Sequence, residues 1–193
     1  MNERYWGGRS VYGVVAHFDQ NTERYIKQVW KELSDKGISK YAEEVQDRRP
    51  HITLAGYNSD VEMEQFIGDF DSFYENKKQL TITLSSLGTF LNTGIVFLAP
   101  VPSKELLELH DSHHNGFDKY LAQAEMQYLP TNWVPHCTIA NRLNEDKLKE
   151  AMVYCTKRIE RLTAAIVEIA VIKVIYDDNT VKSPSIYTKA LRM

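Results

Sequence analysis

The sequence predicts an α+β fold of two similar lobes, related by pseudo-twofold symmetry and joined as a single domain over residues 1–193. Three observations predict it. The hexapeptide Pro-His-Ile-Thr-Leu-Ala at residues 50–55 returns as Pro-His-Cys-Thr-Ile-Ala at residues 135–140. The predicted helices and strands follow a similar order in both halves of the chain. No low-complexity linker separates the halves, and 43% of the residues are hydrophobic, which is enough for a substantial core.

In the first half, apolar runs predict strands, and apolar residues at helical spacing predict helices. The first helix has Asn21 or Thr22 as its cap, reaches about residue 36 and ends at Gly37. Asn92-Thr93-Gly94 predicts the turn between the last two strands. The predicted elements are a strand at 11–18, this first helix, the motif strand at 51–57, a helix at 61–76, and strands at 80–90 and 94–101.

The second half repeats this order. Asn144 is expected to cap the helix that follows the second motif. Residues 177–184 are rich in turn formers and separate two closing strands. The predicted elements are a helix from about 103 to 124, the motif strand at 134–142, a helix from 144 to about 160, and a strand pair at 164–176 and 186–191.

Each motif is expected to present a histidine and a threonine on one face of its strand, because alternate side chains of a strand point the same way. The predicted shared faces are His51, Thr53, Ala55 and Tyr57 in the first strand and His136, Thr138, Ala140 and Arg142 in the second. Two such strands facing each other would surround a gap with two imidazoles and two hydroxyls. That set suits acid–base chemistry on a phosphate.

Imidazole is the natural group for this chemistry, because its ordinary pKa of about 6.5 lies near neutral pH. Opening a cyclic phosphate needs one histidine that takes a proton from water and one that gives a proton to the leaving oxygen. The threonine hydroxyls would donate to the non-bridging oxygens. The motifs are so alike that the sequence leaves open which histidine is the acid.

The paired motifs His51-Ile-Thr53-Leu and His136-Cys-Thr138-Ile resemble the signature of the two-histidine (2H) phosphoesterase superfamily, and most closely its bacterial 2′-5′ RNA ligase-like branch of LigT/YjcG-type proteins. Residues 80–90, 96–98 and 187–191 are also similar to segments of that family. The resemblance implies a bilobal duplicated fold, with antiparallel sheets lining a central cleft and helices outside. It also implies breaking or forming phosphoester bonds at a ribose 2′-hydroxyl without a metal or other cofactor.

The motifs and the resemblance together predict an enzyme that hydrolyses ribose 2′,3′-cyclic phosphates, or related 2′-linked phosphodiesters, of RNA ends or nucleotides. His51, Thr53, His136 and Thr138 are the predicted catalytic residues. Arg142 is expected to bind phosphate and Tyr57 to stack on a base, unless both lie solvated past their strand ends. Two alternatives stay open, namely 2′-5′ RNA ligation in the reverse direction and non-catalytic binding of an RNA end or nucleotide.

Other residues carry weaker signals. The helical spacing of His110, His113 and His114 is compatible with a metal site, although a solvated helix face is the more ordinary interpretation. His17 is expected to be packed or at the surface. Arg48 and Arg49 are expected to be solvated loop charges, and Cys137 a packing residue.

The composition narrows the possible partners. A net charge of −3 argues against a protein that wraps long nucleic acid, but it is compatible with a nucleotide or RNA-end ligand. Two cysteines give no disulfide framework. The N-terminus has no apolar signal core, and no stretch is long enough to span a membrane, so a cytoplasmic location is expected. The oligomeric state is left open.

Overall fold

The computed structural model describes residues 11–177 and 180–193. Residues 1–10, where the absence of an apolar signal core was noted, and residues 178–179 of the turn-rich segment lie outside the described residues. The strands are β1 (Tyr12–Phe18), β2 (Val45–Gln46), β3 (His51–Tyr57), β4 (Leu80–Gly88), β5 (Val96–Pro100), β6 (Cys137–Ala140), β7 (Leu162–Lys173), β8 (Ile175–Asp177), β9 (Thr180–Lys182) and β10 (Ser185–Ala190). The helices are α1 (Gln20–Asp35), α2 (Tyr41–Glu44), α3 (Met63–Tyr74), α4 (Lys104–Gly116) and α5 (Glu145–Arg158), with short 3₁₀ helices at Asp118–Gln123 and Met126–Tyr128.

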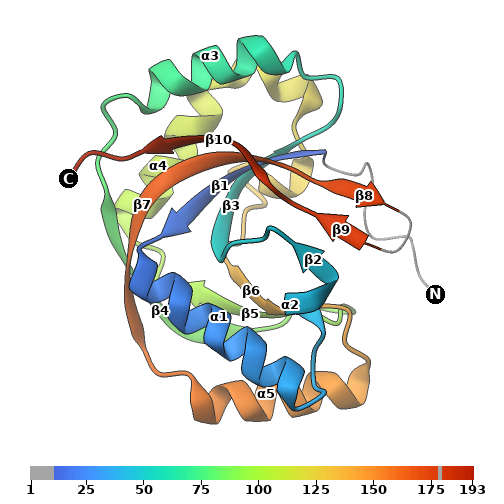
Figure 1. Cartoon of the computed structure of the whole chain (residues 1–193). Coiled ribbons are helices and arrows are strands. Elements are labelled where there is room, and N and C mark those ends of the chain that lie inside the picture. Colours follow the sequence, from blue (N-terminus) through green and yellow to red (C-terminus); the bar gives the residue numbers. More distant parts are fainter. Residues whose placement is uncertain (1–10, 178–179) are drawn as a thin grey trace.

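Seven strands form one continuous antiparallel sheet in the order β3-β1-β7-β4-β5-β6, and β10 pairs with β7 beyond the start of β4 (Figure 1). The order has a twofold pattern, because β3, β1 and β7 on one side match β6, β5 and β4 on the other. The predicted α+β fold with pseudo-twofold symmetry is therefore confirmed. A separate small sheet, β2-β9-β8, lies beside it.

The two halves exchange their closing strands. The strand expected at 94–101 is β5, and it opens the second repeat instead of closing the first, because β5-α4-β6-α5-β7 matches β1-α1-β3-α3-β4. β4 of the first repeat therefore pairs with β5 of the second, whereas β7 of the second repeat pairs with β1 of the first. β4 and β7 also pair with each other, from Leu80 opposite Ile166 to Leu84 opposite Leu162. The sheet is thus continuous through both lobes. Its two end strands, β3 and β6, are the motif strands, and they lie against each other (Figure 1).

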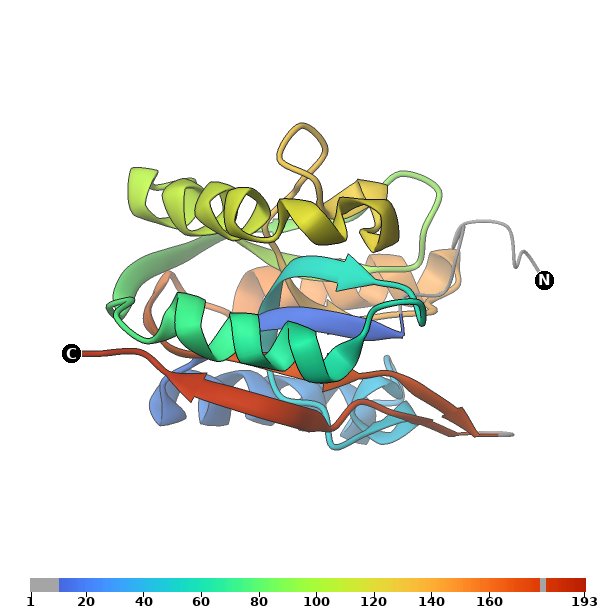
Figure 2. The ribbon, with the colours of Figure 1, turned by 90° about the horizontal axis from the view of Figure 1, so that it is seen from above.

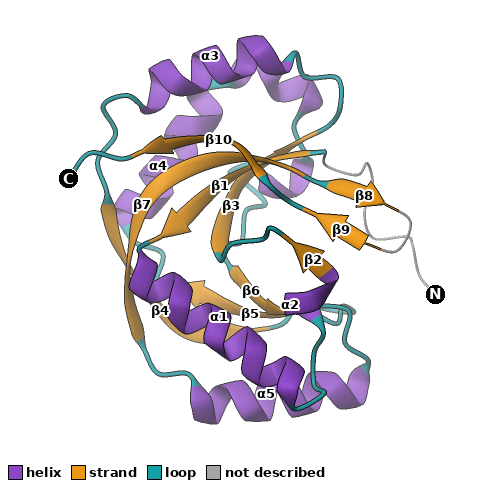
Figure 3. Ribbon diagram, in the orientation of Figure 1, coloured by secondary structure: helices purple, strands orange, loops and turns teal. Residues whose placement is uncertain are grey.

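The helices form two layers on the outside of the sheet (Figures 1 and 3). α1 lies beside α5, and the Arg158 guanidinium of α5 binds Glu32 of α1 at 2.7 Å. α3 lies beside α4, where Phe73 packs edge-on against His113, and Figure 2 looks down on this layer. α1 contacts β6 and β7, whereas α4 contacts β3 and β4, so each motif strand is supported by a helix from the other half. Within the described residues, no helix is long and apolar enough to cross a bilayer.

Helix ends follow local chemistry and correct two predictions. Asp19, rather than Asn21 or Thr22, caps α1, because its carboxylate accepts from the backbone N–H groups of both those residues. α4 ends at Gly116 and does not continue to residue 124. A Cβ at Gly116 would lie 2.4 Å from the Phe73 ring, so the close packing of α3 on α4 requires glycine there. The predicted ends at Gly37 and the cap at Asn144 are confirmed.

The first motif strand has the predicted bounds, but the second is shorter than residues 134–142. Pro135 has no N–H to give to a ladder, and Arg142 takes a left-handed φ of 58°, so β6 is confined between them. Two features were not predicted. Residues 41–46 form α2 and β2, and the turn-rich segment contributes to the β8–β9 pair. α2 and β2 matter because they lead into the first motif, and β9 matters because it pairs with β2.

We predict that Gly94→Ala destabilises the fold by about 1–3 kcal/mol. A Cβ at Gly94 would lie 2.1 Å from the Leu143 carbonyl oxygen and 2.4 Å from its nitrogen, and a backbone neighbour cannot turn away as a side chain can. Gly68→Ala is the matched control, since Gly68 lies in α3 with nothing near its added Cβ. That change should stabilise by about 0.5–1 kcal/mol. Urea unfolding measures both, and equal stabilities would contradict the prediction.

Candidate active site

A β-bulge divides each motif strand into two parts that face opposite ways. In β3, Val15 of β1 pairs with Thr53 and the neighbouring Val14 pairs with Ala55, so Leu54 has no partner. Val14 and Val15 point to opposite sides of the sheet, and their partners must do the same. Thr53 therefore stays on the face of His51, while Ala55 turns to the other face, where it is fully buried.

The second motif has its bulge at the same place. Phe97 of β5 pairs with Thr138 and Val96 pairs with Ala140, which leaves Ile139 unpaired. Ala140 is again turned away from the threonine and fully buried. The prediction that the face continues past each threonine is therefore wrong in both strands, because one extra residue reverses the alternation.

Tyr57 corrects the predicted substrate site most clearly. It lies beyond the bulge, and only 2% of its surface is exposed. Its ring packs against Phe66 of α3, and its hydroxyl lies 3.0 Å from Nε2 of His113. Tyr57 is a core residue of the layer formed by α3 and α4, so it cannot stack on a bound base.

Arg142 follows β6 in a left-handed conformation, so strand parity does not set its direction. Its side chain is 59% exposed and pairs with Glu44 at 3.6 Å. Among the described residues, no hydrogen bond or ion pair joins the Arg142 side chain to a histidine or threonine of the motifs. Its role in substrate binding stays a prediction.

Both motif imidazoles are held in the same way. Nδ1 of His51 lies 2.6 Å from the carbonyl oxygen of Arg49, and Nδ1 of His136 lies 2.7 Å from that of Val134. A carbonyl only accepts, so each Nδ1 carries the proton and donates it. When neutral, each imidazole therefore has its lone pair on Nε2. In the described part of the protein, neither Nε2 has a hydrogen-bond partner, and both residues are half-buried.

The motif threonines are fixed by groups from the opposite half of the chain. The indole N–H of Trp30 in α1 donates to the Thr138 carbonyl at 3.2 Å. The indole N–H of Trp133, just before β6, donates to the Thr53 carbonyl at 2.9 Å. Thus each half of the chain holds the motif of the other.

Two tyrosines also come from the half of the chain opposite to the threonine that they approach. The Tyr41 hydroxyl, from the segment before the first motif, lies near the side chain of Thr138, which offsets part of the rise in the tyrosine pKa that burial causes. The Tyr128 hydroxyl, from the segment before the second motif, lies in the same way near the side chain of Thr53. Each threonine of the predicted site therefore has a tyrosine hydroxyl beside it. The sequence signal was their similar position, ten residues before His51 and eight before His136.

The surroundings of His51 are polar and charged. His17 is its register partner on β1, and the two rings lie 6.2 Å apart. The positively charged guanidinium of Arg48, three residues earlier in the chain, disfavours a second positive charge on His51. Burial first, and then the charges of Arg48 and His17, lower the pKa of His51 to about 3. His51 is therefore neutral at ordinary pH.

The surroundings of His136 are aromatic. The rings of Phe90 and Phe97 lie 4.9 Å and 5.3 Å from the imidazole. Burial lowers the pKa of His136 below its usual range, and the hydrogen bond to the Val134 carbonyl offsets part of that shift. These neutral rings place no positive charge beside the imidazole, whereas His51 has a guanidinium near it. The two histidines thus share geometry but differ in electrostatics.

The prediction that Arg48 and Arg49 are solvated loop charges is wrong. Arg49 pairs with Glu23 at 2.7 Å and also with Glu168, which lies 3.0 Å from Nδ1 of buried His17. These pairs fix the residue whose carbonyl holds His51. Arg48 donates to the hydroxyls of Tyr41 and Ser183. Ser183 and Glu168 lie 135 and 119 residues from the arginines that they bind, so no local pattern could have revealed these two partners.

The histidines of α4 are hydrogen-bonded to the protein. His113 lies between the hydroxyls of Tyr57 and Tyr74, both at 3.0 Å. His110 binds the Tyr128 carbonyl at 2.8 Å and stacks on Trp133 at 3.8 Å, and His114 binds the Leu54 carbonyl. No three possible metal-ligating side chains come together in the described residues. The cluster instead supports the groups that hold the first motif.

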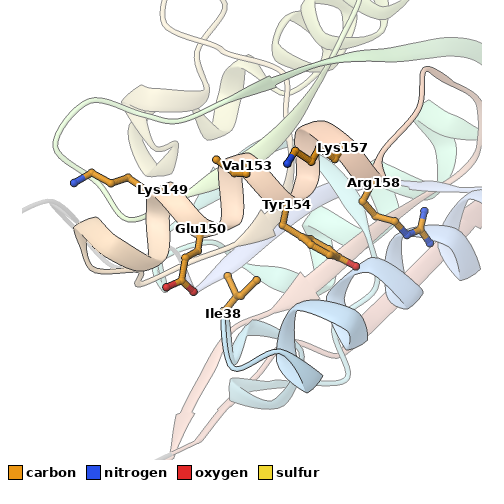
Figure 4. Close-up of a pocket in the computed structure, with 7 residues that line it drawn as sticks. All are labelled: Ile38, Lys149, Glu150, Val153, Tyr154, Lys157 and Arg158. Atoms are coloured by element: carbon orange, nitrogen blue, oxygen red, sulfur yellow. The ribbon is translucent and has the colours of Figure 1, made fainter.

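A hollow on the outer face of α5 is distinct from this site (Figure 4). It lies where Ile38, in the loop after α1, approaches α5. None of the motif residues lines it. Its lining residues are Ile38, Lys149, Glu150, Val153, Tyr154, Lys157 and Arg158.

Comparison with known proteins agrees with this arrangement. A sequence model of the 2′-5′ RNA ligase superfamily matches residues 18–178, which include both motifs. The chain belongs to this superfamily. The resemblance to LigT-like 2H phosphoesterases is confirmed by the match and by the fold. No curated protein sequence matches the chain.

Solved structures share the fold at low sequence identity. E. coli LigT complexed with 3′-AMP is 14% identical, with a TM-score of 0.61 over 94% of this chain and 98% of LigT. TT0787 of Thermus thermophilus is 12% identical, with a TM-score of 0.63 over 94% and 97% of the two chains. A protein described as a phosphoesterase is 13% identical, with a TM-score of 0.62 over 95% and 99%. LigT has also been crystallised with NADP+ and with ATP.

We predict that Tyr57→Phe lowers stability by about 1–3 kcal/mol. The substitution removes a buried hydroxyl and leaves Nε2 of His113 without that partner. Urea unfolding measures the change. A variant as stable as the wild type would contradict the role of Tyr57 in the core.

Proposed function

We propose that the chain is a cytoplasmic, metal-independent phosphoesterase that opens ribose 2′,3′-cyclic phosphates, or related 2′-linked phosphodiesters, of RNA ends or nucleotides. The observation that carries this proposal is the pair of imidazoles on adjacent motif strands, each held in the same tautomer with Nε2 available. A reaction that takes one proton and gives another needs two such groups. Membership of the 2′-5′ RNA ligase superfamily supports this chemistry.

In this proposal His51 is the general base and His136 the general acid. His51 is kept neutral by burial and by Arg48, so its Nε2 can take a proton from water as the water oxygen bonds to phosphorus. His136, between two aromatic rings, becomes protonated when an anionic phosphate binds beside it. It then gives its proton to the ribose oxygen as the bond from phosphorus to that oxygen breaks.

The threonine hydroxyls stabilise the transition state. Thr53 and Thr138 stand on the same faces as the two histidines, and the hydroxyls of Tyr128 and Tyr41 lie beside them and would orient their hydroxyls. Each can donate to a non-bridging oxygen, where negative charge gathers during the reaction. Hydroxyls that are already oriented need little reorganisation when the substrate binds.

The nucleotide chemistry is supported by LigT, which shares this fold and binds 3′-AMP. A 3′-phosphate is what remains when a 2′,3′-cyclic phosphate opens at its 2′-oxygen. The alternative activity, 2′-5′ RNA ligation, is the same displacement with a ribose 5′-hydroxyl in place of water, and the bond from phosphorus to the 3′-oxygen is the one that breaks. A binding module without catalysis would not need two titrating groups with available Nε2 atoms.

The first test removes each reactive nitrogen and keeps the supporting hydrogen bond. In His51→Asn and His136→Asn, the amide can still donate to the carbonyl two residues earlier. We expect each variant to stay folded and to lose about 10²–10⁴-fold in kcat/KM for 2′,3′-cyclic nucleotides. The double variant should be little worse than either single, because the pair acts as a unit.

Turnover is measured by identifying the products, in buffer that contains a chelator. The wild-type rate should be unaffected by the chelator. A fully active, folded His51→Asn enzyme, or a rate that needs added divalent ion, would refute the proposed mechanism.

The second test is the pH dependence. As pH rises, kcat/KM of the free enzyme should begin to fall below about pH 6.5, the ordinary pKa of histidine. The reason is that the pKa of His136 is lowered, so its protonated form is lost at lower pH than usual. At the acid end, kcat/KM should fall only near pH 3, where His51 takes up a proton. Bound phosphate stabilises the imidazolium, so the alkaline limb of kcat should lie at higher pH than that of kcat/KM. Coincident limbs above about pH 7 would contradict this assignment.

A further inference from the structure

Arg48 occupies an unusual place among the cations near the motifs. It lies three residues before His51, in the segment that joins β2 to β3, and it is half-buried. Its Nη1–H donates to the Tyr41 hydroxyl at 2.7 Å, and its Nε–H donates to the Ser183 hydroxyl at 3.3 Å. The guanidinium carbon also lies 5.1 Å from the centre of the Tyr41 ring. Two buried neutral side chains therefore fix the direction of the guanidinium.

No carboxylate forms an ion pair with this group in the described part of the chain. The adjacent Arg49 is paired with both Glu23 and Glu168, whereas the two hydrogen-bond partners of Arg48 are uncharged hydroxyls. A guanidinium has five N–H donors, and the two bonds to Tyr41 and Ser183 use two of them. Arg48 thus keeps its positive charge and three N–H donors for a further partner.

The position of Arg48 connects it to both motifs. Tyr41, which accepts from Arg48, lies near the side chain of Thr138 in the second motif. The positive charge of Arg48 also lies close enough to His51 of the first motif, and to Tyr128 beside Thr53, to lower the pKa of both groups. A cation held within reach of both His-x-Thr motifs fits a bound anion shared by them.

We propose that Arg48 binds the substrate phosphate, with its guanidinium fork donating to the non-bridging oxygens while Tyr41 and Ser183 hold it in place. This inference rests on the proposed function, because it places the phosphate between the two motifs. It assigns to Arg48 the role that strand parity assigned to Arg142. Arg142 is largely exposed, has a left-handed backbone and pairs with Glu44.

The test measures binding of 3′-AMP and of adenosine by calorimetric titration. Arg48→Gln should weaken 3′-AMP about 10- to 100-fold, because a charge-assisted bond to phosphate is lost, and should leave adenosine binding unchanged. Arg48→Lys keeps the charge but loses the fork and should fall in between. Arg192→Gln removes an equally exposed arginine that is paired with Glu75, so it is the matched control and should stay within about twofold of the wild type. Arg142→Gln tests the rival assignment. Thermal unfolding verifies that each variant is folded, and Arg48→Lys serves if Arg48→Gln does not fold.

A second measurement distinguishes phosphate binding by Arg48 from a purely structural role in holding the segment between β2 and β3. NMR titration of His51 should show its pKa moving upward in Arg48→Gln, since a cation beside it is gone, and staying low in Arg48→Lys. Unchanged 3′-AMP affinity in Arg48→Gln, or equal losses of 3′-AMP and adenosine affinity, would overturn the inference. The same holds if Arg142→Gln alone weakens 3′-AMP.

The outcomes also separate this inference from the proposed function. If the wild type turns over cyclic nucleotides and Arg48→Gln binds 3′-AMP normally, only the inference fails. If the wild type shows no turnover but its 3′-AMP binding depends on Arg48, the phosphate site stands and the proposed reaction fails. If the wild type neither turns over substrate nor binds 3′-AMP, both fail.

Discussion

One unpaired residue in each motif strand sets what the site contains. Leu54 and Ile139 have no partner on the neighbouring strand, so each strand changes face directly after its threonine. Before the bulge, histidine and threonine point to the site. After it, Ala55 and Ala140 are buried in the core. Without the bulge, Ala55 and Ala140 would face the site together with the histidine and threonine and would be lost to the core. The bulge therefore lets one short strand serve both the site and the core.

The site is symmetric in its frame and asymmetric in its surroundings. The frame consists of the Nδ1–H bonds to carbonyls and the exchanged tryptophan and tyrosine contacts, which recur around both motifs. The surroundings differ, with Arg48 and His17 beside His51 and with Phe90 and Phe97 beside His136. A duplicated backbone thus supplies two equivalent imidazoles, and the neighbouring side chains then separate them into groups with different proton affinity.

The sequence predicts the fold class, most element positions and the two His-x-Thr pairs, because these follow from local periodicity and from the repetition itself. It fails at Tyr57, because an unpaired Leu54 looks the same in sequence as a paired one. It also fails at Arg48 and Arg49, whose partners Ser183 and Glu168 lie 135 and 119 residues away. The exchange of Trp30 and Trp133 between the motifs is hidden for the same reason. Contacts between residues this far apart in the sequence are set by the topology of the sheet, so they leave no pattern in a short stretch of sequence.

The crossing of β4 and β7 between the lobes has a consequence for the origin of the molecule. A polypeptide with only β1 to β4 would have no strand of its own in the place of β7, and its β4 would project without a neighbour. Two identical copies would satisfy each other by donating these strands, as in a domain-swapped homodimer, and would bring two copies of the same motif together at their axis. The present chain has the arrangement expected if the two genes of such a dimer became one. Fusion would free each histidine to acquire neighbours of its own.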